Sequence, residues 1–547
     1  MRPATRLVLL MVMLQAPLSA ATDDVALRTR AELSGFTETS RAEDVTRVLS
    51  ALQRASPSVH VTEFGRSQEA RPLPLAVVSS PGVKDAAAAR RSGKPRVLIL
   101  ANIHAGEVEG KEAALILARR LTLGDLRPLL PRLVVLFAPL YNADGNERIS
   151  LDHRPEQFGP LGGVGTRENA AGLDLNRDFM KLETPESRAL ARLLNEWDPQ
   201  VVIDLHTTNG SYHAYHLTYA PPLAVGADPR LVEFTRGLLG TATHALEARG
   251  WRTHAYGNFT TEGQLERSQE RPAVPGGGAT AWRTFDCRPR FVTNGVGLRN
   301  RIAILSEAYS YLSFARRIEV TEAFVETLLA QIARRGSEVK GLIEDIDRDT
   351  VSAAARGTLG PLGTSGRLAA FAGASPILIG DVESRINPRS GRTMTVMKET
   401  SVRQQLMQEY GFFAPVDAIV APRAYAVVAD GTGAVERVRA LLILHGIRTE
   451  PVTSPRAVAA EAVVPGGIAR SEHATQGHEE IRLVNSRRER RTLSLPTGSL
   501  IVPMDQPLAR LAFHLLEPTS DDGLVTWNFL DEWLIEGKDV PIFRVVQ

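Results

Sequence analysis

The stretch PRVLILANIHAGEVEGKEAALILARR, residues 95–120, joins an apolar run to a helical pattern through a short polar turn. VLILANI (97–103) has the length of a strand, and the residues after Glu109 have the spacing of a helix. His104 and Glu107 lie between them. A strand that is apolar on both faces is typical of a mostly parallel sheet covered by helices. The stretch therefore predicts an α/β fold with polar side chains at the end of a buried strand.

The same alternation continues along the chain. Further apolar runs of strand length occur at 133–140, 201–205 and 302–306, and helical patterns begin at Pro185, with Thr184 as N-cap, and at Arg230. We expect a mostly parallel or mixed twisted sheet flanked by helices, followed by a smaller α+β accessory region. In that region AYAVVA (424–429) predicts a strand, and the following residues predict a helix closed by Gly446.

Length and charge limit the possible organisation and partners. A chain of 547 residues exceeds one compact core, so we expect a catalytic domain at 22–345 and an accessory domain of unassigned role at 365–547, separated by a glycine-rich stretch. The net charge of +2 and the scattered arginines give no reason to expect a nucleic-acid partner. We interpret RRERR at 487–491 as a solvated turn.

The first residues have the order of a secretory signal peptide. Arg2 and Arg6 precede the apolar LVLLMVML, and small residues follow in LSAATDD, which predicts a signal at 1–21 cleaved after Ala20 or Ala21. The apolar run is short for a bilayer span, so we expect no stable membrane anchor after cleavage. Cys287 is the single cysteine, which excludes an intrachain disulfide and a thiolate metal site. We expect a periplasmic or secreted protein.

Three polar residues follow three of the predicted strands: His104, His206 after VVIDL, and Glu307 after IAILS. Ligand sites of α/β folds lie beyond the carboxyl ends of the strands. Catalytic zinc is commonly held by three protein ligands, and two histidines with one glutamate are a recognised set. His104 and Glu107, three residues apart, can point to one centre, and His206 can complete it if its strand lies alongside.

Other residues near these positions have a structural interpretation. His213 and His216 in SYHAYH are alternatives to His206, which we prefer because it directly ends a strand. We interpret Glu109 and Glu112 as solvated helix residues, and Asp144 in NADG as a turn cap.

Several motifs together resemble the zinc carboxypeptidases of the M14 type. HAGE, NADG, GLDLNRDF, LHT and LSEAYSY occur in that family's order across residues 95–311. The resemblance implies one zinc per chain bound by His104, Glu107 and His206. It further implies Glu307 as general base, Asp174 as the carboxylate that orients a zinc histidine, Asn176 and Arg177 as the clamp on the substrate's terminal carboxylate, and Arg167 as the oxyanion-stabilising arginine.

One departure from the family concerns a tyrosine that often lies on a loop ahead of the catalytic glutamate. No tyrosine lies between Tyr256 and Glu307, and the corresponding TNGVGLRNR, which we expect to be a loop, carries glycines instead. The role falls to Tyr256, to Tyr309 or to a shifted tyrosine, or it is unfilled.

The leading hypothesis is an exported zinc carboxypeptidase that acts on peptides with a free C-terminal carboxylate. The alternatives are a zinc deacylase or amidase of the aspartoacylase type, a peptidoglycan-peptide amidase, and a metal-bound but inactive binding protein, which an intact Glu307 and Arg167 argue against.

Overall fold

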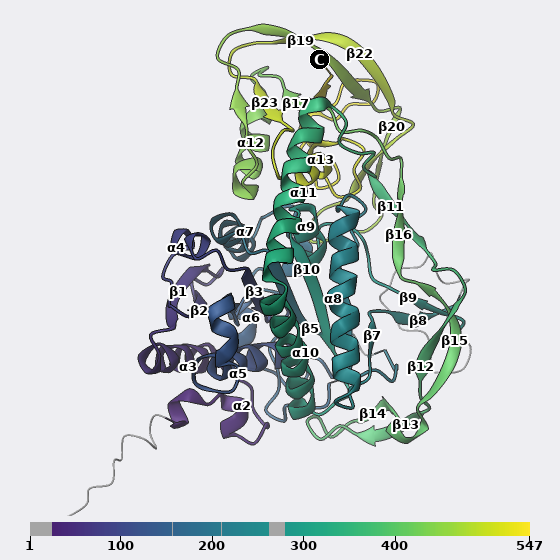
Figure 1. The fold of residues 1–547 in the computed structure, drawn as a ribbon. Coiled ribbons are helices and arrows are strands. Elements are labelled where there is room, and N and C mark those ends of the chain that lie inside the picture. Colours follow the sequence, from purple (N-terminus) through teal and green to yellow (C-terminus); the bar gives the residue numbers. More distant parts are fainter. Residues whose placement is uncertain (1–23, 156, 209–210, 262–278, 547) are drawn as a thin grey trace, which may run out of the picture.

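The computed structural model describes residues 24–155, 157–208, 211–261 and 279–546 (Figure 1). The predicted signal peptide at 1–21 lies outside the described residues, as does the glycine run at 276–278, which we expect to form a loop.

A mixed sheet forms the centre of the fold. Among the described residues it has eight strands in the order β1-β2-β4-β3-β5-β10-β6-β7. The strands are β1 (Val59–Arg66), β2 (Pro72–Ser79), β3 (Arg96–Ala101), β4 (Val134–Ala138), β5 (Val201–Thr207), β6 (Leu217–Ala220), β7 (Thr253–Ala255) and β10 (Ile302–Ala308). The central strands β4, β3, β5 and β10 are parallel, and every residue of β3, β4 and β5 is buried. The predicted fold class is confirmed.

Helices cover both faces of this sheet. One core packs alternate strand residues such as Val97 and Ile99 against helices on one side, and a second core packs Leu98 and Leu100 against helices on the other. The first side has α3 (Ala42–Ala55), α5 (Glu109–Leu123), α8 (Pro229–Glu247) and α10 (Phe314–Arg334); the second has α4 (Ala86–Arg91), α7 (Pro185–Trp197), α9 (Val292–Leu298), α12 (Ala434–His445) and α13 (Ala509–Leu516). Because α12 and α13 come from the C-terminal region, that region shares the sheet's second core.

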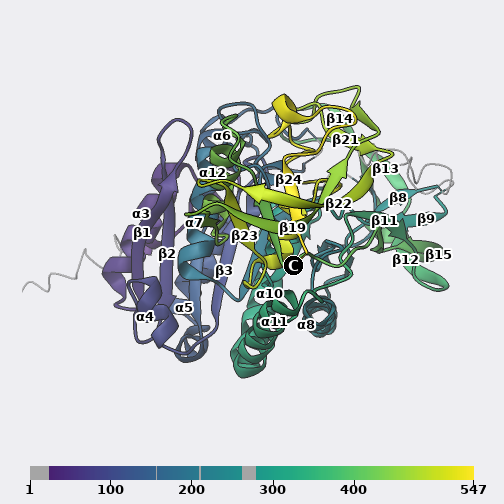
Figure 2. The same ribbon diagram turned by 90° about the horizontal axis from the view of Figure 1, so that it is seen from above.

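The C-terminal region follows α11 (Gly336–Arg356), which Gly357 ends in a left-handed conformation. Its main element is an antiparallel sheet in the order β18-β23-β17-β24-β19-β22. These strands are β17 (Ala424–Val427), β18 (Glu450–Pro451), β19 (Arg456–Val464), β22 (Arg487–Leu495), β23 (Leu500–Pro503) and β24 (Ile542–Val545). Seen from above, they lie over the upper end of the central sheet (Figure 2). The predicted end of the catalytic domain, residue 345, lies within α11, and the division at 345 and 365 stays a prediction.

Paired strands run down one side of the molecule from this region (Figure 1). They are β11 (Ser365–Ala369) with β16 (Phe412–Val416), β12 (Ala374–Ile379) with β15 (Arg403–Tyr410), and the hairpin of β13 (Val382–Ile386) and β14 (Thr393–Met397). Strand β15 also pairs with β9 (Ala281–Arg283), which pairs with β8 (Asn258–Thr260). A further hairpin has β20 (Gly467–Arg470) and β21 (Ile481–Val484). Through the pairing of β15 with β9, a strand of the C-terminal region joins a small sheet with strands from the part of the chain that carries the central sheet.

The remaining short elements connect these layers. They are α2 (Arg30–Leu33), α6 (Ala143–Glu147) and the 3-10 turns η1 (Arg127–Arg132), η2 (Leu175–Arg177), η4 (Glu399–Ser401) and η5 (Asp531–Trp533).

Several local expectations are confirmed and others are wrong. Thr184 caps α7 and Gly446 closes α12, as predicted. RRERR is not a turn: it lies in β22, which pairs with β19 along its whole length. TNGVGLRNR is mostly helix α9, whose Gly295 lies where a Cβ would come within 2.1 Å of the Phe179 ring.

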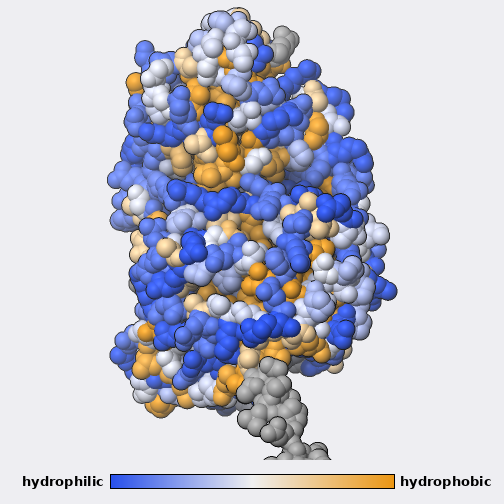
Figure 3. Space-filling view, turned by 90° about the vertical axis from the view of Figure 1, so that its left-hand side faces the viewer, coloured by the Kyte–Doolittle hydropathy of each residue, from blue (hydrophilic) through white to orange (hydrophobic). Residues whose placement is uncertain are grey.

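The outer surface beside β1 and α3 carries scattered hydrophobic residues among many hydrophilic ones (Figure 3), as on most protein surfaces in contact with water. Within the described part of the chain, no helix is long and apolar enough to cross a membrane.

Glu109 and Glu112 are not solvated: both are fully buried. Glu109 accepts hydrogen bonds from Thr207 and, at 3.3 Å, from Nε of Arg317. Glu112 accepts from the hydroxyl of Thr39 at 2.9 Å and from the backbone N–H of Ser40 at 2.6 Å. These partners lie far away in the sequence, which is why helical spacing did not predict the burial.

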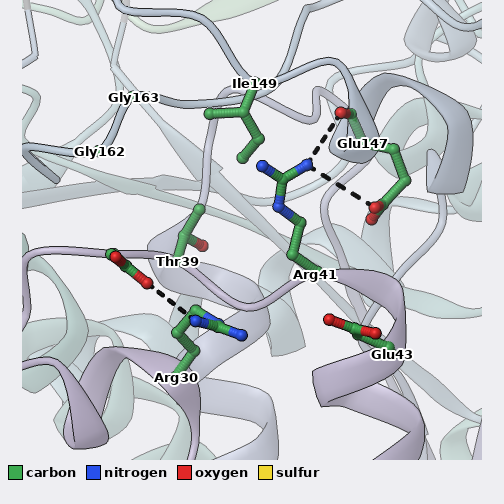
Figure 4. A pocket seen from close by; sticks show the side chains of 9 residues that line it. Arg30, Thr39, Arg41, Glu43, Glu147, Ile149, Gly162 and Gly163 are labelled. Atoms are coloured by element: carbon green, nitrogen blue, oxygen red, sulfur yellow. Dashed lines mark hydrogen bonds and ion pairs between the residues drawn. The ribbon is translucent and has the colours of Figure 1, made fainter.

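Glu112 thereby attaches the N-terminal segment that contains Thr39 and Ser40 to α5. The segment also contacts α6, since the Arg41 guanidinium donates to the Glu147 carbonyl at 3.1 Å and the Ala42 N–H donates to the Glu147 carboxylate at 2.8 Å. Figure 4 shows the Arg41 guanidinium pointing to Glu147, with Thr39 and Glu43 among the other residues that line the same pocket.

We predict that Glu112→Ala lowers the free energy of unfolding by about 1–3 kcal/mol, because the buried Ser40 N–H loses its acceptor. Urea unfolding followed by fluorescence measures this. Glu43→Ala, at an exposed position of the same segment, is the control and should change stability by less than about 0.5 kcal/mol. Equal stability of both variants would contradict the proposed attachment.

Candidate functional site

The three strand ends named from the sequence are neighbours. Strand β3 is parallel to β5, and β5 is parallel to β10, with His206 and Glu307 in register on adjacent strands. Residues at matching positions of parallel strands point to the same face of a sheet. His206 and Glu307 are therefore side by side at one edge of the sheet.

The turn after β3 brings His104 and Glu107 to the same edge. Asn102 adopts a left-handed conformation with φ of 64°, which asparagine tolerates better than most residues, and the Glu107 N–H donates to the His104 carbonyl at 2.9 Å. Gly110, in the first turn of α5, lies where a Cβ would come within 2.7 Å of Leu205. The glycine lets the helix approach β5 closely and so brings Glu107 to His206.

The carboxylate of Glu107 lies between the two histidines. Its Oε1 is 2.9 Å from Nδ1 of His104, its Oε2 is 2.8 Å from Nδ1 of His206, and the two ring centroids are 5.0 Å apart. Burial opposes ionisation of Glu107, yet Arg154, His104 and His206 together hold the pKa of its carboxyl well below the ordinary value. Glu107 is therefore an anion beside two imidazole nitrogens.

Each histidine has a second carboxylate on its other nitrogen. Nε2 of His104 is 3.0 Å from Oδ1 of Asp174, and Nε2 of His206 is 3.0 Å from Oδ2 of Asp204. Burial lowers the pKa of His206, but Asp204 and Glu107 outweigh it and raise that pKa well above the usual range. Carboxylates in this position fix the orientation of metal-binding histidines.

These residues fit a zinc ion. One potential ligand atom from each of His104, Glu107 and His206 lies within 4.8 Å of the others, and all three residues are buried. Two imidazoles and one carboxylate are a recognised catalytic zinc set, and both histidine Nδ1 atoms face the same carboxylate. The donor chemistry and its convergence therefore suit the metal.

The alternative histidines lie elsewhere. His213 is buried among aromatic rings, 4.6 Å from Tyr309 and 5.7 Å from Trp282 between ring centroids, and burial lowers its pKa to about 3. His216 accepts a hydrogen bond from the Arg252 N–H at 3.1 Å. Among the described residues, neither belongs to the group of potential metal ligands.

Glu307 lies beside this group with intermediate exposure. Burial, followed by the negative charges of Glu107 and Asp204, raises the pKa of Glu307 to about 8 against the opposing effect of His206 and Arg154. A bound cation would act in the same direction as His206 and favour the carboxylate.

The arginines implied by the resemblance surround Asp174. Arg167 donates to Oδ2 of Asp174 through Nε at 3.0 Å and Nη2 at 2.7 Å, and its Nη1 lies 3.4 Å from Nδ1 of His104. Arg177 stacks on Phe291, 4.1 Å from the ring centroid, with 27% of its side chain exposed. Oδ1 of Asn176 accepts from the Val292 N–H at 2.9 Å. Nη1 of Arg177 lies 3.8 Å from Oδ2 of Asp174, the carboxylate next to His104.

The two candidate tyrosines differ in their surroundings. Burial and then the charge of Glu307 raise the pKa of Tyr256, whose ring packs against Phe285 at 5.7 Å. Tyr309 is 2% exposed and packs against His213.

The sequence did not identify three residues at this site. Asp204 was visible as a charge inside an apolar strand, two residues before His206. Arg154 donates to Oε1 of Glu107, and Oε1 of Gln476 accepts from the Asp174 N–H at 2.7 Å; no local pattern marked either residue.

Asp144 is not the cap of its turn: Asn142 caps α6, and the buried Asp144 accepts from Ser67 and Arg71.

Comparison with known proteins finds a family model, relatives and solved structures that are similar to this chain. Residues 45–270 match the family model described as zinc carboxypeptidase. Carboxypeptidase 2 of Trichophyton tonsurans is 23% identical over 514 residues, which cover 89% of this chain and 82% of that protein. Human carboxypeptidase D is 35% identical over 117 residues, 19% of this chain and 8% of that protein. A metallo-carboxypeptidase structure from Burkholderia cenocepacia aligns with a TM-score of 0.37 at 19% identity, over 53% of this chain and 68% of that one.

We predict that the purified protein contains about one zinc per chain and that His206→Ala loses most of it, because one of three ligands is removed. Metal analysis after dialysis measures this. His213→Ala, at an equally buried histidine, should keep its zinc. Loss of zinc from the His213 variant but not from the His206 variant would exchange the two assignments.

Proposed function

We propose that this chain removes C-terminal residues from peptides with Glu307 as general base. The premise is that residues 45–270 belong to the zinc carboxypeptidase family and that the chain is a metallocarboxypeptidase. The observation that carries this proposal is the position of Glu307 in register with His206, one strand away from a ligand of the zinc group.

Three groups would perform the hydrolysis. Zinc held by His104, Glu107 and His206 would supply Lewis-acid chemistry for the scissile carbonyl and for a water molecule. Glu307 takes a proton from the attacking water and delivers it to the leaving amine. Arg167, with its guanidinium next to His104, stabilises the negative charge that develops on the carbonyl oxygen. Asp174 holds His104 in orientation through a hydrogen bond to Nε2, and the Asp204 carboxylate lies at ion-pair distance from Nε2 of His206.

Arg177 would recognise the end of the substrate. Its guanidinium can bind a carboxylate through two parallel N–H bonds, and its stacking on Phe291 limits its motion. Asn176, next to it in η2, has its side-chain oxygen occupied by the Val292 N–H, so its amide hydrogens are the part that can face a substrate. Together these groups select peptides with a free C-terminal carboxylate.

We also propose that the protein acts outside the cytoplasm, in the periplasm or as a secreted enzyme. The support is the signal-like order of charged, apolar and small residues at 1–21.

We predict that Glu307→Gln lowers turnover by roughly two to four orders of magnitude, because the amide cannot accept the proton. Steady-state assay on a peptide substrate measures turnover, and metal analysis should find zinc unchanged. Glu319→Gln, on the exposed side of α10, is the control and should remain fully active. Near-normal turnover of the Glu307 variant would refute its role as base.

We predict that amidated peptides are cleaved more slowly than free-acid peptides by roughly 30-fold or more, since loss of one partner of a buried charged pair costs about 2–5 kcal/mol. The measurement is kcat/KM for matched peptides. Arg177→Ala should lose activity on free acids and discriminate little, whereas Arg192→Ala, on the exposed side of α7, should behave as wild type. Equal cleavage of both peptides by the wild type would favour an amidase.

A further inference from the structure

Besides Arg167, Arg154 contacts the proposed zinc ligands His104, Glu107 and His206 through Glu107. It comes from a segment outside the sequence motifs that contain those ligands. Arg154 lies in the loop 153–157 and donates to Oε1 of Glu107, with 12% of its side chain exposed. A carboxylate offers about four lone-pair positions on its two oxygens. Glu107 can therefore accept from Arg154 and still bind a metal, and this charge-assisted bond restricts the rotation of the carboxylate.

The backbone around Arg154 is closely constrained. Arg154 has a φ of 50°, in the left-handed region that residues with a Cβ rarely occupy. Its side chain passes over Gly106, where a Cβ would come within 2.9 Å of Cγ of Arg154. Such a conformation persists only where surrounding structure holds it.

The structure that holds it comes from the C-terminal region. Arg389, in the hairpin β13–β14, donates through Nη2 to the carbonyl of His153 at 2.7 Å and to that of Arg154. Nδ2 of Asn387 donates to the carbonyls of Pro155 at 2.9 Å and Gln157 at 3.3 Å.

The two hairpin side chains differ from their neighbours in burial. Asn387 is 1% exposed and Arg389 is 6% exposed, whereas Ile386 beside them is 62% exposed. The side chain of Arg385 is also 56% exposed and pairs within the hairpin with Glu383. The hairpin therefore points two polar side chains specifically into the loop 153–157.

We propose that Arg154 is a positioning residue of the zinc centre and that Asn387 and Arg389 of the C-terminal hairpin hold it against Glu107. This inference rests on the proposed zinc ligands. It assigns to the C-terminal region a part in metal binding, because the orientation of a ligand's hydrogen-bonding partner affects metal affinity.

The test is the zinc dissociation constant of the full-length mature chain, measured by competition with a coloured chelator. Arg154→Ala should weaken zinc binding by about 10–100-fold, the usual effect of removing a partner of a metal ligand. Arg389→Ala should weaken it in the same direction. The double variant should be no weaker than Arg154→Ala alone, because Arg389 acts through Arg154.

Arg385→Ala is the matched control, since it removes an arginine from the same hairpin without touching the loop, and its zinc affinity should equal that of the wild type. Circular dichroism of the zinc-free variants checks folding; if Arg389→Ala does not fold, Asn387→Ala takes its place. As a further readout, the visible bands of the Co²⁺-substituted protein should shift in the Arg154 and Arg389 variants and not in Arg385→Ala.

Three outcomes separate the hypotheses. A wild type that binds no zinc would overturn the proposed function itself. A wild type that binds zinc, with Arg154→Ala within about twofold of it, would overturn only the positioning role. Additive losses in the double variant would show that Arg389 affects zinc without Arg154 and would overturn the proposed connection.

Discussion

The contact between the Glu107 carboxylate and two buried imidazoles is the constraint on which the site depends. Three charged or chargeable groups at this distance are costly to bury unless each has further partners. Asp174 and Asp204 provide them for the histidines, and Arg154 provides one for Glu107. Because Asp174 and Arg154 come from segments outside the strands that carry the site, the position of Glu107 depends on those segments as well as on β5.

The parallel strands β3, β5 and β10 make this convergence possible. Neighbouring parallel strands have their carboxyl ends at the same end of the sheet. The parallel pairing of β5 with β10 is therefore enough to bring His206 and Glu307 side by side. The short turn from β3 into α5 then brings His104 and Glu107 to that edge. A buried sheet with helices on both faces makes the strand ends rigid, as a site that positions reacting groups requires.

The C-terminal region is connected to the central sheet by more than a linker. Its helices α12 and α13 share the core on one face of that sheet, its strand β15 pairs with β9, and its hairpins contact the loops at 153–157 and at Asp174. The C-terminal sheet also has a hydrophobic core of its own, with residues such as Ala426 and Ala462, and the division into domains at 345 and 365 stays a prediction.

The sequence by itself determined the strands that carry the site and the order of its residues, because continuous apolar runs and the spacing of His104 and Glu107 are local properties. It misjudged Glu109 and Glu112, since their burial depends on Arg317 and Ser40, which only the folded chain brings to them. The prediction that RRERR forms a turn was also wrong, because these residues pair with β19 as part of strand β22. Only the tertiary structure placed Arg154 and Gln476 at the site, because contacts between distant segments depend on how the layers pack and leave no periodic signal in the chain.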